Sequence, residues 1–219
     1  MRQTKKQFLV LGLGRFGASV ARSLTEMGHE VMAVDCDQDR VDEVAEYVDN
    51  CVQANATDED VLRSFDPASF DACIVAVGTN VRDSVMMALL CKEAGSPMVV
   101  AKAMDDLHGK LLAKIGVDRV IFPERDMGQR LAKSLVSPSM LDMMDLAEGY
   151  QIAEVLSPAA WDGKTLEQLS VRRKYNVSVI AVRRNGRLIA SPGADTRLEE
   201  GDALILLGRE EDVDRIDRL

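Results

Sequence analysis

Between residues 8 and about 122, short apolar segments alternate with longer segments that carry polar residues on one side. This alternation is typical of a parallel sheet whose strands are buried on both faces and joined by crossover helices. We predict strands at 8–11, 31–34, 51–53, 72–77, 98–102 and 119–122. Helices are expected at 15–27, 38–47, 58–64 and 80–94, with another that begins at Pro123. The pattern predicts a Rossmann-like, doubly wound α/β domain.

Beyond residue 139 the spacing of apolar positions changes, because the expected strands alternate apolar and polar residues. Asn185-Gly186 is a two-residue hairpin signal between two such strands. The Met- and Leu-rich segment 140–146 is interpreted as an amphipathic turn that packs against helices. The other predicted elements are strands at 150–156, 177–183 and 187–189, a short helix at 165–169, and a final strand within 198–208 before a charged helix. We therefore predict two domains, at 1–139 and 140–219, the second a small α+β domain.

A glycine-rich turn joins the first predicted strand to the helix after it. Gly12, Gly14 and Gly17 have the GxGxxG spacing, which allows a tight turn, close approach of a phosphate and close packing of the helix. Asp35 ends the next strand, where its carboxylate can accept a hydrogen bond from a ribose hydroxyl. The same charge disfavours the 2′-phosphate of NADP. The turn predicts an adenine nucleotide with its phosphates at the helix N-terminus.

Three charged residues are expected at the carboxyl edge of the sheet. Arg15 lies inside the glycine turn, where a guanidinium can pair with phosphate oxygens. The added positive charge favours a ligand with more phosphate charge than a dinucleotide, such as a nucleoside di- or triphosphate. Lys102 ends the fifth strand and adds a second cation. Glu124 follows the last strand, and we expect it to hold a divalent cation shared with phosphate or to pair with Arg15.

Small and polar residues follow other strands at the same edge and are suited to contact adenine and ribose. These are Asn55, Ala56 and Thr57 after the third strand and Val77, Gly78 and Thr79 after the fourth. Arg40 could close over the adenine or pair with Asp37. The remaining residues that we place at the nucleotide are Phe16, Asp37, Ala103 and Met104.

Composition narrows the class of protein. The 219 residues include 27 Lys and Arg against 36 Asp and Glu, a net charge of -9, without a basic block for a nucleic-acid backbone. The four cysteines form no CxxC pair and are expected to be reduced core thiols of a cytosolic protein. No apolar run approaches the roughly 20 residues of a membrane span. A role at a membrane would therefore need a membrane partner.

Candidate catalytic residues are few. His29 is expected in a turn at the entry side of a strand, and His108, in the helix after Lys102, either reaches the cleft or is exposed. No recognisable nucleophile signature or metal spacing is present in the sequence. We therefore expect a protein that is not an enzyme. Two alternatives stay open: an NAD-dependent oxidoreductase, which would lack an evident catalytic base, and an NAD(H) redox sensor, which would lack an output module.

The motifs together resemble a known family. The run GLGRFG, Asp35, Asn55-Ala56-Thr57, the Val-Ala-Lys that ends at Lys102, and the segment IFPERDMG at 121–128 are similar to RCK regulatory subunits of Ktr- and Trk-type potassium uptake systems. The resemblance covers nearly the whole chain, since the tail with its LEEGDAL turn at 198–204 looks like the C-terminal RCK domain.

The resemblance implies a cytoplasmic gating ring, peripheral on the inner face of the membrane, that docks on a membrane-embedded potassium-translocating subunit. Homodimers would assemble into a homo-octamer, with ATP and ADP favouring different ring shapes and NAD(H) able to occupy the same site. It implies that Arg15 contacts the terminal phosphate and Lys102 the phosphate edge, with Mg or Ca at Glu124. Asp35 would contact the ribose, Asn55 and Ala56 the adenine, and His108 would also lie at the nucleotide. In some relatives cyclic di-AMP binds the C-terminal domain, where the corresponding positions are Arg172, Asn176, Val177 and Pro192.

Overall fold

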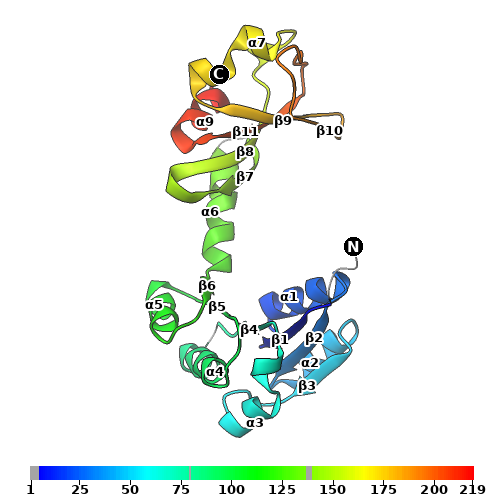
Figure 1. Ribbon diagram of the computed structural model, residues 1–219, viewed down its shortest axis with the longest axis vertical. Helices are drawn as coiled ribbons and strands as arrows, with labels where there is room; N and C mark the ends of the chain where they lie inside the picture. The colour runs from blue at the N-terminus through cyan, green and yellow to red at the C-terminus, as the bar shows by residue number, and fades with distance from the viewer. Residues whose placement is uncertain (1–4, 79, 137–139) are drawn as a thin grey trace. The chain divides into compact units, whose positions relative to one another are not determined.

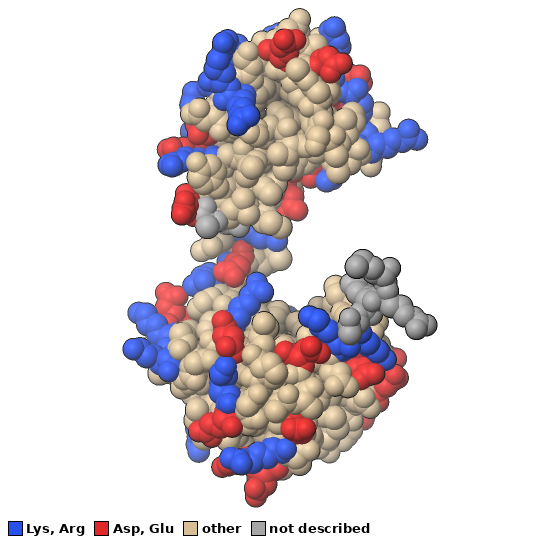
Figure 2. Space-filling model, in the orientation of Figure 1, with Lys and Arg blue, Asp and Glu red and all other residues tan. Residues whose placement is uncertain are grey.

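The computed structural model describes residues 5–78, 80–136 and 140–219. The chain forms two compact units, Met1–Arg125 and Asp126–Leu219 (Figure 1). On the face drawn in Figure 2, basic and acidic side chains are interspersed over each unit. That face therefore presents charges of both signs.

The first unit is built on a parallel six-stranded sheet in the order β3-β2-β1-β4-β5-β6, which is the Rossmann order and confirms the predicted fold. Its strands are β1 (Gln7–Leu11), β2 (Glu30–Asp35), β3 (Asn50–Gln53), β4 (Ala72–Val75), β5 (Val99–Lys102) and β6 (Arg119–Ile121). Its helices are α1 (Arg15–Glu26), α2 (Gln38–Ala45), α3 (Glu59–Ser64), the 3-10 turn η1 (Pro67–Ser69), α4 (Val81–Glu93) and α5 (Asp106–Lys114). The helix α6 (Pro123–Val136) begins in this unit.

Both faces of this sheet are buried, which explains its continuous apolar strands. Leu9 and Leu11 pack into one core with Leu112, whereas Val10, between them, packs into a second core with Ala33 on the opposite face. Successive side chains of a strand point to opposite faces, so a strand covered on both sides must be apolar at every position.

The second unit contains an antiparallel sheet in the order β10-β9-β11-β8-β7. Its strands are β7 (Met140–Asp145), β8 (Tyr150–Leu156), β9 (Ser178–Arg184), β10 (Arg187–Ala190) and β11 (Ala203–Arg209). Its short helices are η2 (Ala147–Gly149), η3 (Ala159–Trp161), α7 (Leu166–Leu169), α8 (Val171–Tyr175) and α9 (Glu210–Asp217). One core, which includes Trp161, Leu204 and Ile216, joins the sheet to these helices.

The interpretation of residues 140–146 as an amphipathic turn was wrong. This segment forms β7, which pairs antiparallel with β8. Met143 is buried in the core while its neighbour Met144 is exposed. The segment thus supplies an edge strand, because β8 would otherwise leave its backbone hydrogen-bonding groups on that side without a partner.

Two ion pairs connect α6 to other elements of the second unit. Arg130 Nη2 lies 2.6 Å from Asp142 Oδ1, and Lys133 Nζ lies 2.8 Å from Glu210 Oε1. The second compact unit accordingly begins at Asp126, inside α6. The domain boundary that we placed at 139–140 stays a prediction.

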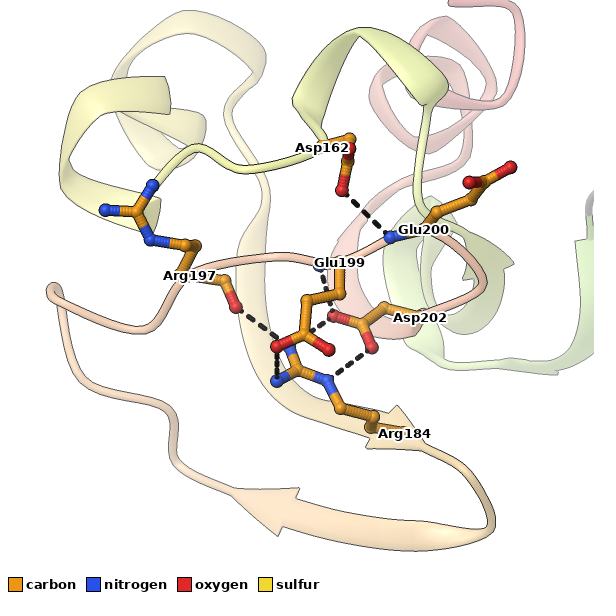
Figure 3. A network of polar contacts seen from close by, with 6 residues as sticks. All are labelled: Asp162, Arg184, Arg197, Glu199, Glu200 and Asp202. Carbon is orange, nitrogen blue, oxygen red and sulfur yellow. Dashed lines mark hydrogen bonds and ion pairs between the residues drawn. The ribbon is translucent and has the colours of Figure 1, made fainter.

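Arg184, the last residue of β9, anchors the turn that leads into β11 (Figure 3). Its Nε and Nη2 atoms donate to the two oxygens of Asp202 at 2.8 and 2.7 Å, and Nη2 also donates to the carbonyl oxygen of Arg197 at 2.8 Å. Its Nη1 atom lies 2.5 Å from Glu199 Oε1. The side chain of Asp202 is 1% exposed. This bidentate, charge-assisted contact fixes the turn in one geometry.

We expect Asp202→Asn to destabilise the second unit by about 2–3 kcal/mol, because it breaks a buried ion pair and leaves the guanidinium partly unpaired. Trp161, the one tryptophan of the chain, is buried in this unit and reports its urea unfolding by fluorescence. The exposed Asp195 provides a matched control, and Asp195→Asn is expected to change stability by less than about 0.5 kcal/mol. Equal effects of the two substitutions would contradict this role of the ion pair.

The same contact predicts a pH dependence. The Arg184 guanidinium holds the pKa of Asp202 below its usual range in the folded protein. The stabilisation is therefore complete above the unfolded-state pKa of about 3.9 and is lost as pH falls through the lower folded-state pKa. Urea unfolding of the wild type below pH 4, followed at Trp161, should show a loss of stability that is smaller in Asp202→Asn.

Candidate nucleotide site

The three glycines of the GxGxxG motif differ in what surrounds the position of the missing side chain. Gly12 has φ +92°, and a Cβ there would lie 2.6 Å from Val77 Cγ2. A Cβ on Gly17 would lie 1.9 Å from the carbonyl oxygen of Gly12, so only glycine allows α1 to approach the turn this closely. A Cβ on Gly14 would meet no atom within 4 Å, and Gly14 is the N-cap of α1 without a side-chain cap. The first amides of α1 are therefore available to an anion.

The turn opens into a cavity of about 600 Å³ at the carboxyl edge of the parallel sheet. Its volume is within the range of about 300–1,000 Å³ that is usual for ligand pockets. The lining residues are Gly12, Gly14, Arg15, Phe16, Val34, Asp35, Cys36, Arg40, Ala54, Asn55, Ala56, Thr57, Ala76, Val77, Gly78, Asn80, Asp83, Met87, Lys102, Met104 and Glu124. Most of the residues that we predicted for the nucleotide are thus brought together.

Asp35 is 6% exposed and holds the glycine turn against β2. Its Oδ2 atom accepts from the amide of Leu13 at 2.6 Å, and its Oδ1 atom accepts from the amide of Asp37 at 3.0 Å. Arg40 lies 3.4 Å from Asp37 and 3.5 Å from Asp35, so it pairs with acids while it also lines the cavity. The carboxylate predicted to contact ribose is therefore fixed in position before a ligand arrives.

The loop after β3 is ordered by an Asx turn. Asn55 Oδ1 accepts from the amide of Thr57 at 3.1 Å and from its hydroxyl at 2.8 Å. Asparagine side chains stabilise turns in this way, and the turn here places Asn55, Ala56 and Thr57 along the cavity. Thr79, which we also predicted at the nucleotide, lies outside the described residues.

The cations of the cavity differ in their partners. Arg15 is exposed and forms no ion pair within residues 5–78, 80–136 and 140–219. Lys102 Nζ lies 2.5 Å from Glu124 Oε1, and hydrogen bonding to this ammonium lowers the pKa of Glu124. Glu124 therefore pairs with Lys102 rather than with Arg15, the partner that we had considered. The described residues contain no group of three or more His, Cys, Asp and Glu that could hold a metal, so Mg or Ca at Glu124 stays a prediction.

Four predicted residues do not line the cavity: Gly17, Asp37, Ala103 and His108. The carboxylate of Asp37 instead caps α2 by accepting from the amide of Asp39 at 3.0 Å. His108 is 1% exposed, so the alternative of an exposed helix histidine was wrong. Its Nδ1 atom accepts from the amide of Met104 at 3.3 Å, and burial lowers its pKa. The imidazole is therefore neutral at neutral pH.

Sequence reasoning missed several lining residues. The expectation that Cys36 is a core thiol was wrong, since this residue is exposed and lines the cavity. It comes directly after Asp35, the last residue of β2, and so lies at the edge of the sheet. Partial desolvation of the thiol and the negative charge of the neighbouring Asp35 raise the pKa of Cys36. Asn80, the N-cap of α4, and Asp83 and Met87 in the N-terminal half of that helix also line the cavity. The residue in the sequence that indicates the N-terminus of α4 is Asn80, because asparagine is a preferred N-cap. Its side chain accepts hydrogen bonds from the amides of Arg82 and Asp83.

A second cavity of about 530 Å³ lies in the C-terminal unit. It is lined by Leu146, Tyr150, Arg172, Asn176, Ser178, Leu207 and Gly208. Two of the four positions considered for a second ligand, Arg172 and Asn176, are therefore brought together. Val177 is fully buried in the core and Pro192 does not line the cavity.

The chain was compared with known proteins. Residues 8–123 match the TrkA-N domain and residues 150–219 match the TrkA-C domain. Ktr system potassium uptake protein C of Bacillus subtilis is 40% identical over 98% of this chain and 97% of its own length. The chain belongs to the Ktr/Trk family of potassium uptake proteins. Other members are the Ktr system potassium uptake proteins A of Bacillus subtilis, 40% identical over 99% of this chain and 97% of its own length, and of Vibrio alginolyticus, 37% identical over 95% and 94%.

Solved structures agree with the fold of this Ktr/Trk family member. The GsuK RCK domain has a TM-score of 0.67 and 22% identity, and the match covers 100% of this chain and 48% of that chain. The GsuK channel bound to NAD also has a TM-score of 0.67 and 22% identity, over 100% of this chain and 40% of that chain. Within the described part of this chain, no helix has the length and apolar character that crossing a membrane requires.

The glycine geometry predicts that two similar substitutions lower the free energy of unfolding by different amounts. Gly17→Ala is expected to lower the free energy of unfolding of the first unit by about 1–3 kcal/mol, because the new methyl group collides with backbone. Gly14→Ala, at φ -63° and in open space, should cost less than about 0.5 kcal/mol. Urea unfolding followed by circular dichroism compares the two variants. A Gly14→Ala variant as unstable as Gly17→Ala would contradict the geometry.

Proposed function

We propose that this chain is the nucleotide-binding regulatory subunit of a potassium uptake system and controls a membrane-embedded potassium-translocating subunit. Its membership of the Ktr/Trk family over nearly its full length supports the potassium role. The observation that carries the regulatory role is Arg15, a cation without an ion-pair partner among the described residues, at the open end of the glycine turn. The protein would act in the cytoplasm, at the inner face of the membrane through its partner.

We propose that ATP and ADP are the regulatory ligands. The arrangement fits them, since the uncapped α1 and Arg15 can bind phosphates, Asp35 is fixed for ribose, and Asn55 borders the space for adenine. NAD(H) is a second candidate for this cavity, and one protein of similar fold is the GsuK channel bound to NAD. Mg or Ca would accompany ATP at Glu124.

The proposed switch works through a difference in affinity between conformations. A nucleotide can shift an assembly between two states only if it binds those states with different affinities. The γ-phosphate is the chemical group that distinguishes ATP from ADP. Shifting the ratio of open to closed membrane partner from 1:99 to 99:1 requires a difference in binding free energy of about 5.5 kcal/mol between the two states, which several coupled subunits could share.

An assembly of homodimers into an octameric ring would supply these coupled subunits. The apolar residues Met127, Leu135 and Val136 of α6 are 60, 73 and 83% exposed in the single chain. Apolar groups at this level of exposure along one helix favour contact with a second copy. This supports pairing of subunits around α6.

We also propose the second cavity as the site of cyclic di-AMP. Arg172 can pair with a phosphate of that ligand, and Asn176 offers an amide to a base or ribose.

We favour a regulatory protein without catalytic activity over an NAD-dependent oxidoreductase. The one histidine that we considered for acid–base chemistry at the nicotinamide, His108, is neutral, buried and absent from the cavity lining.

Substitution of Arg15 tests the nucleotide site. Arg15→Gln is expected to weaken ATP and ADP binding about 10- to 100-fold, the loss of a charge-assisted phosphate contact, and to leave adenosine binding unchanged. Isothermal titration calorimetry measures the three affinities. The control is Arg22→Gln, which removes an exposed cation of the same helix that pairs with Glu26. Unchanged ATP and ADP affinities in Arg15→Gln would overturn the proposed phosphate site.

A further inference from the structure

Lys102 carries a charge that is mostly shielded from water. Its side chain is 14% exposed. The ammonium lies 5.9 Å from the centre of the Phe16 ring, and a Cβ on Gly78 would lie 3.0 Å from Lys102 Cε. The charge is therefore held at the glycine turn and inside the cavity. A cation in such a place is costly without an anionic partner.

The present partner of Lys102 is a group that can leave easily. Glu124 is 71% exposed on its side chain and lies 2.5 Å from the ammonium. A carboxylate at the surface regains its hydration when the pair opens, so opening costs little for Glu124. The cost of opening falls on Lys102, which must find another anion.

A nucleotide phosphate in the cavity is such an anion. Lys102, Arg15 and Gly14 line the same cavity, so a phosphate chain bound at the glycine turn lies within the space that Lys102 faces. A terminal phosphate carries more charge and more acceptor oxygens than one carboxylate. Adenosine has no phosphate and would leave the pair intact.

We propose that Glu124 competes with the terminal phosphate of a nucleotide for Lys102, so that Glu124 sets how strongly the cavity discriminates by phosphate number. This inference rests on the proposed nucleotide binding. The exchange has a structural consequence, because Glu124 is the second residue of α6. Phosphate binding releases one of the contacts that hold the first turn of α6, while Arg125 in that turn keeps its ion pair with Asp106 at 3.0 Å. The same helix continues into the second unit, where Arg130 and Lys133 form ion pairs with Asp142 and Glu210.

The test measures ATP, ADP and adenosine binding by calorimetry in EDTA, which removes any divalent cation. Glu124→Gln is expected to bind ATP about 10-fold more tightly than the wild type, to bind adenosine equally, and to unfold at a lower temperature without ligand. Lys102→Met should weaken ATP binding, and adding Glu124→Gln to Lys102→Met should have no further effect on it. Glu46→Gln, at an exposed position of the first unit, is the matched control and should bind ATP like the wild type.

The outcomes separate this inference from the proposed function. If Glu124→Gln binds ATP in EDTA as the wild type does, or more weakly, competition is overturned while nucleotide binding stands. If the wild type binds neither ATP nor ADP, both proposals fail. Hydrogen exchange tests the release of α6: amides 127–130 should exchange faster in the wild type with ATP than without it, and equally fast in Glu124→Gln under both conditions. No change in the wild type would overturn the link to α6.

Discussion

The contact between Gly17 and the carbonyl oxygen of Gly12 is the constraint on which the candidate site depends. A single methyl group at Gly17 would lie 1.9 Å from that oxygen, so α1 can start where it does only because the side chain is absent. This close packing directs the uncapped first turn of α1 and Arg15 into the cavity. Asp35 completes the arrangement, because it accepts from the amide of Leu13 inside the same turn. The backbone that would bind phosphate is thus fixed by packing within the first unit.

The charges around this turn belong to two groups with different roles. Arg15 has no ion-pair partner among the described residues and is available to a ligand. Lys102 is shielded and already paired with Glu124. A ligand in the cavity therefore meets an available cation in Arg15, whereas Lys102 would have to exchange Glu124 for the ligand and Arg40 is paired with Asp35 and Asp37. Because Glu124 lies in the first turn of α6, the charge balance of the cavity is connected by the chain itself to the helix that runs from the first unit into the second.

The sequence predicted the features that depend on local pattern. Strands buried on both faces are continuously apolar, as β1 is from Phe8 to Leu11, and Asn185-Gly186 forms the predicted hairpin turn with both residues at positive φ. Residues 140–146 were misjudged because a short Met- and Leu-rich run has no clear period, and its strand form depends on pairing with β8. The Lys102–Glu124 pair and the burial of His108 depend on side-chain directions across separate elements, which spacing along a sequence does not encode.

The measurement that tests the central claim most directly is potassium flux into liposomes that contain a Ktr-type membrane subunit, with and without this chain. The account predicts that flux differs between ATP and ADP only when the chain is present. It also predicts that the Gly14→Ala chain, whose added methyl group has open space within the protein, removes that difference, because the methyl group would keep a phosphate from approaching the backbone of the glycine turn closely. A flux that is the same with ATP, with ADP and without nucleotide, in the presence of the folded wild-type chain, would contradict the account.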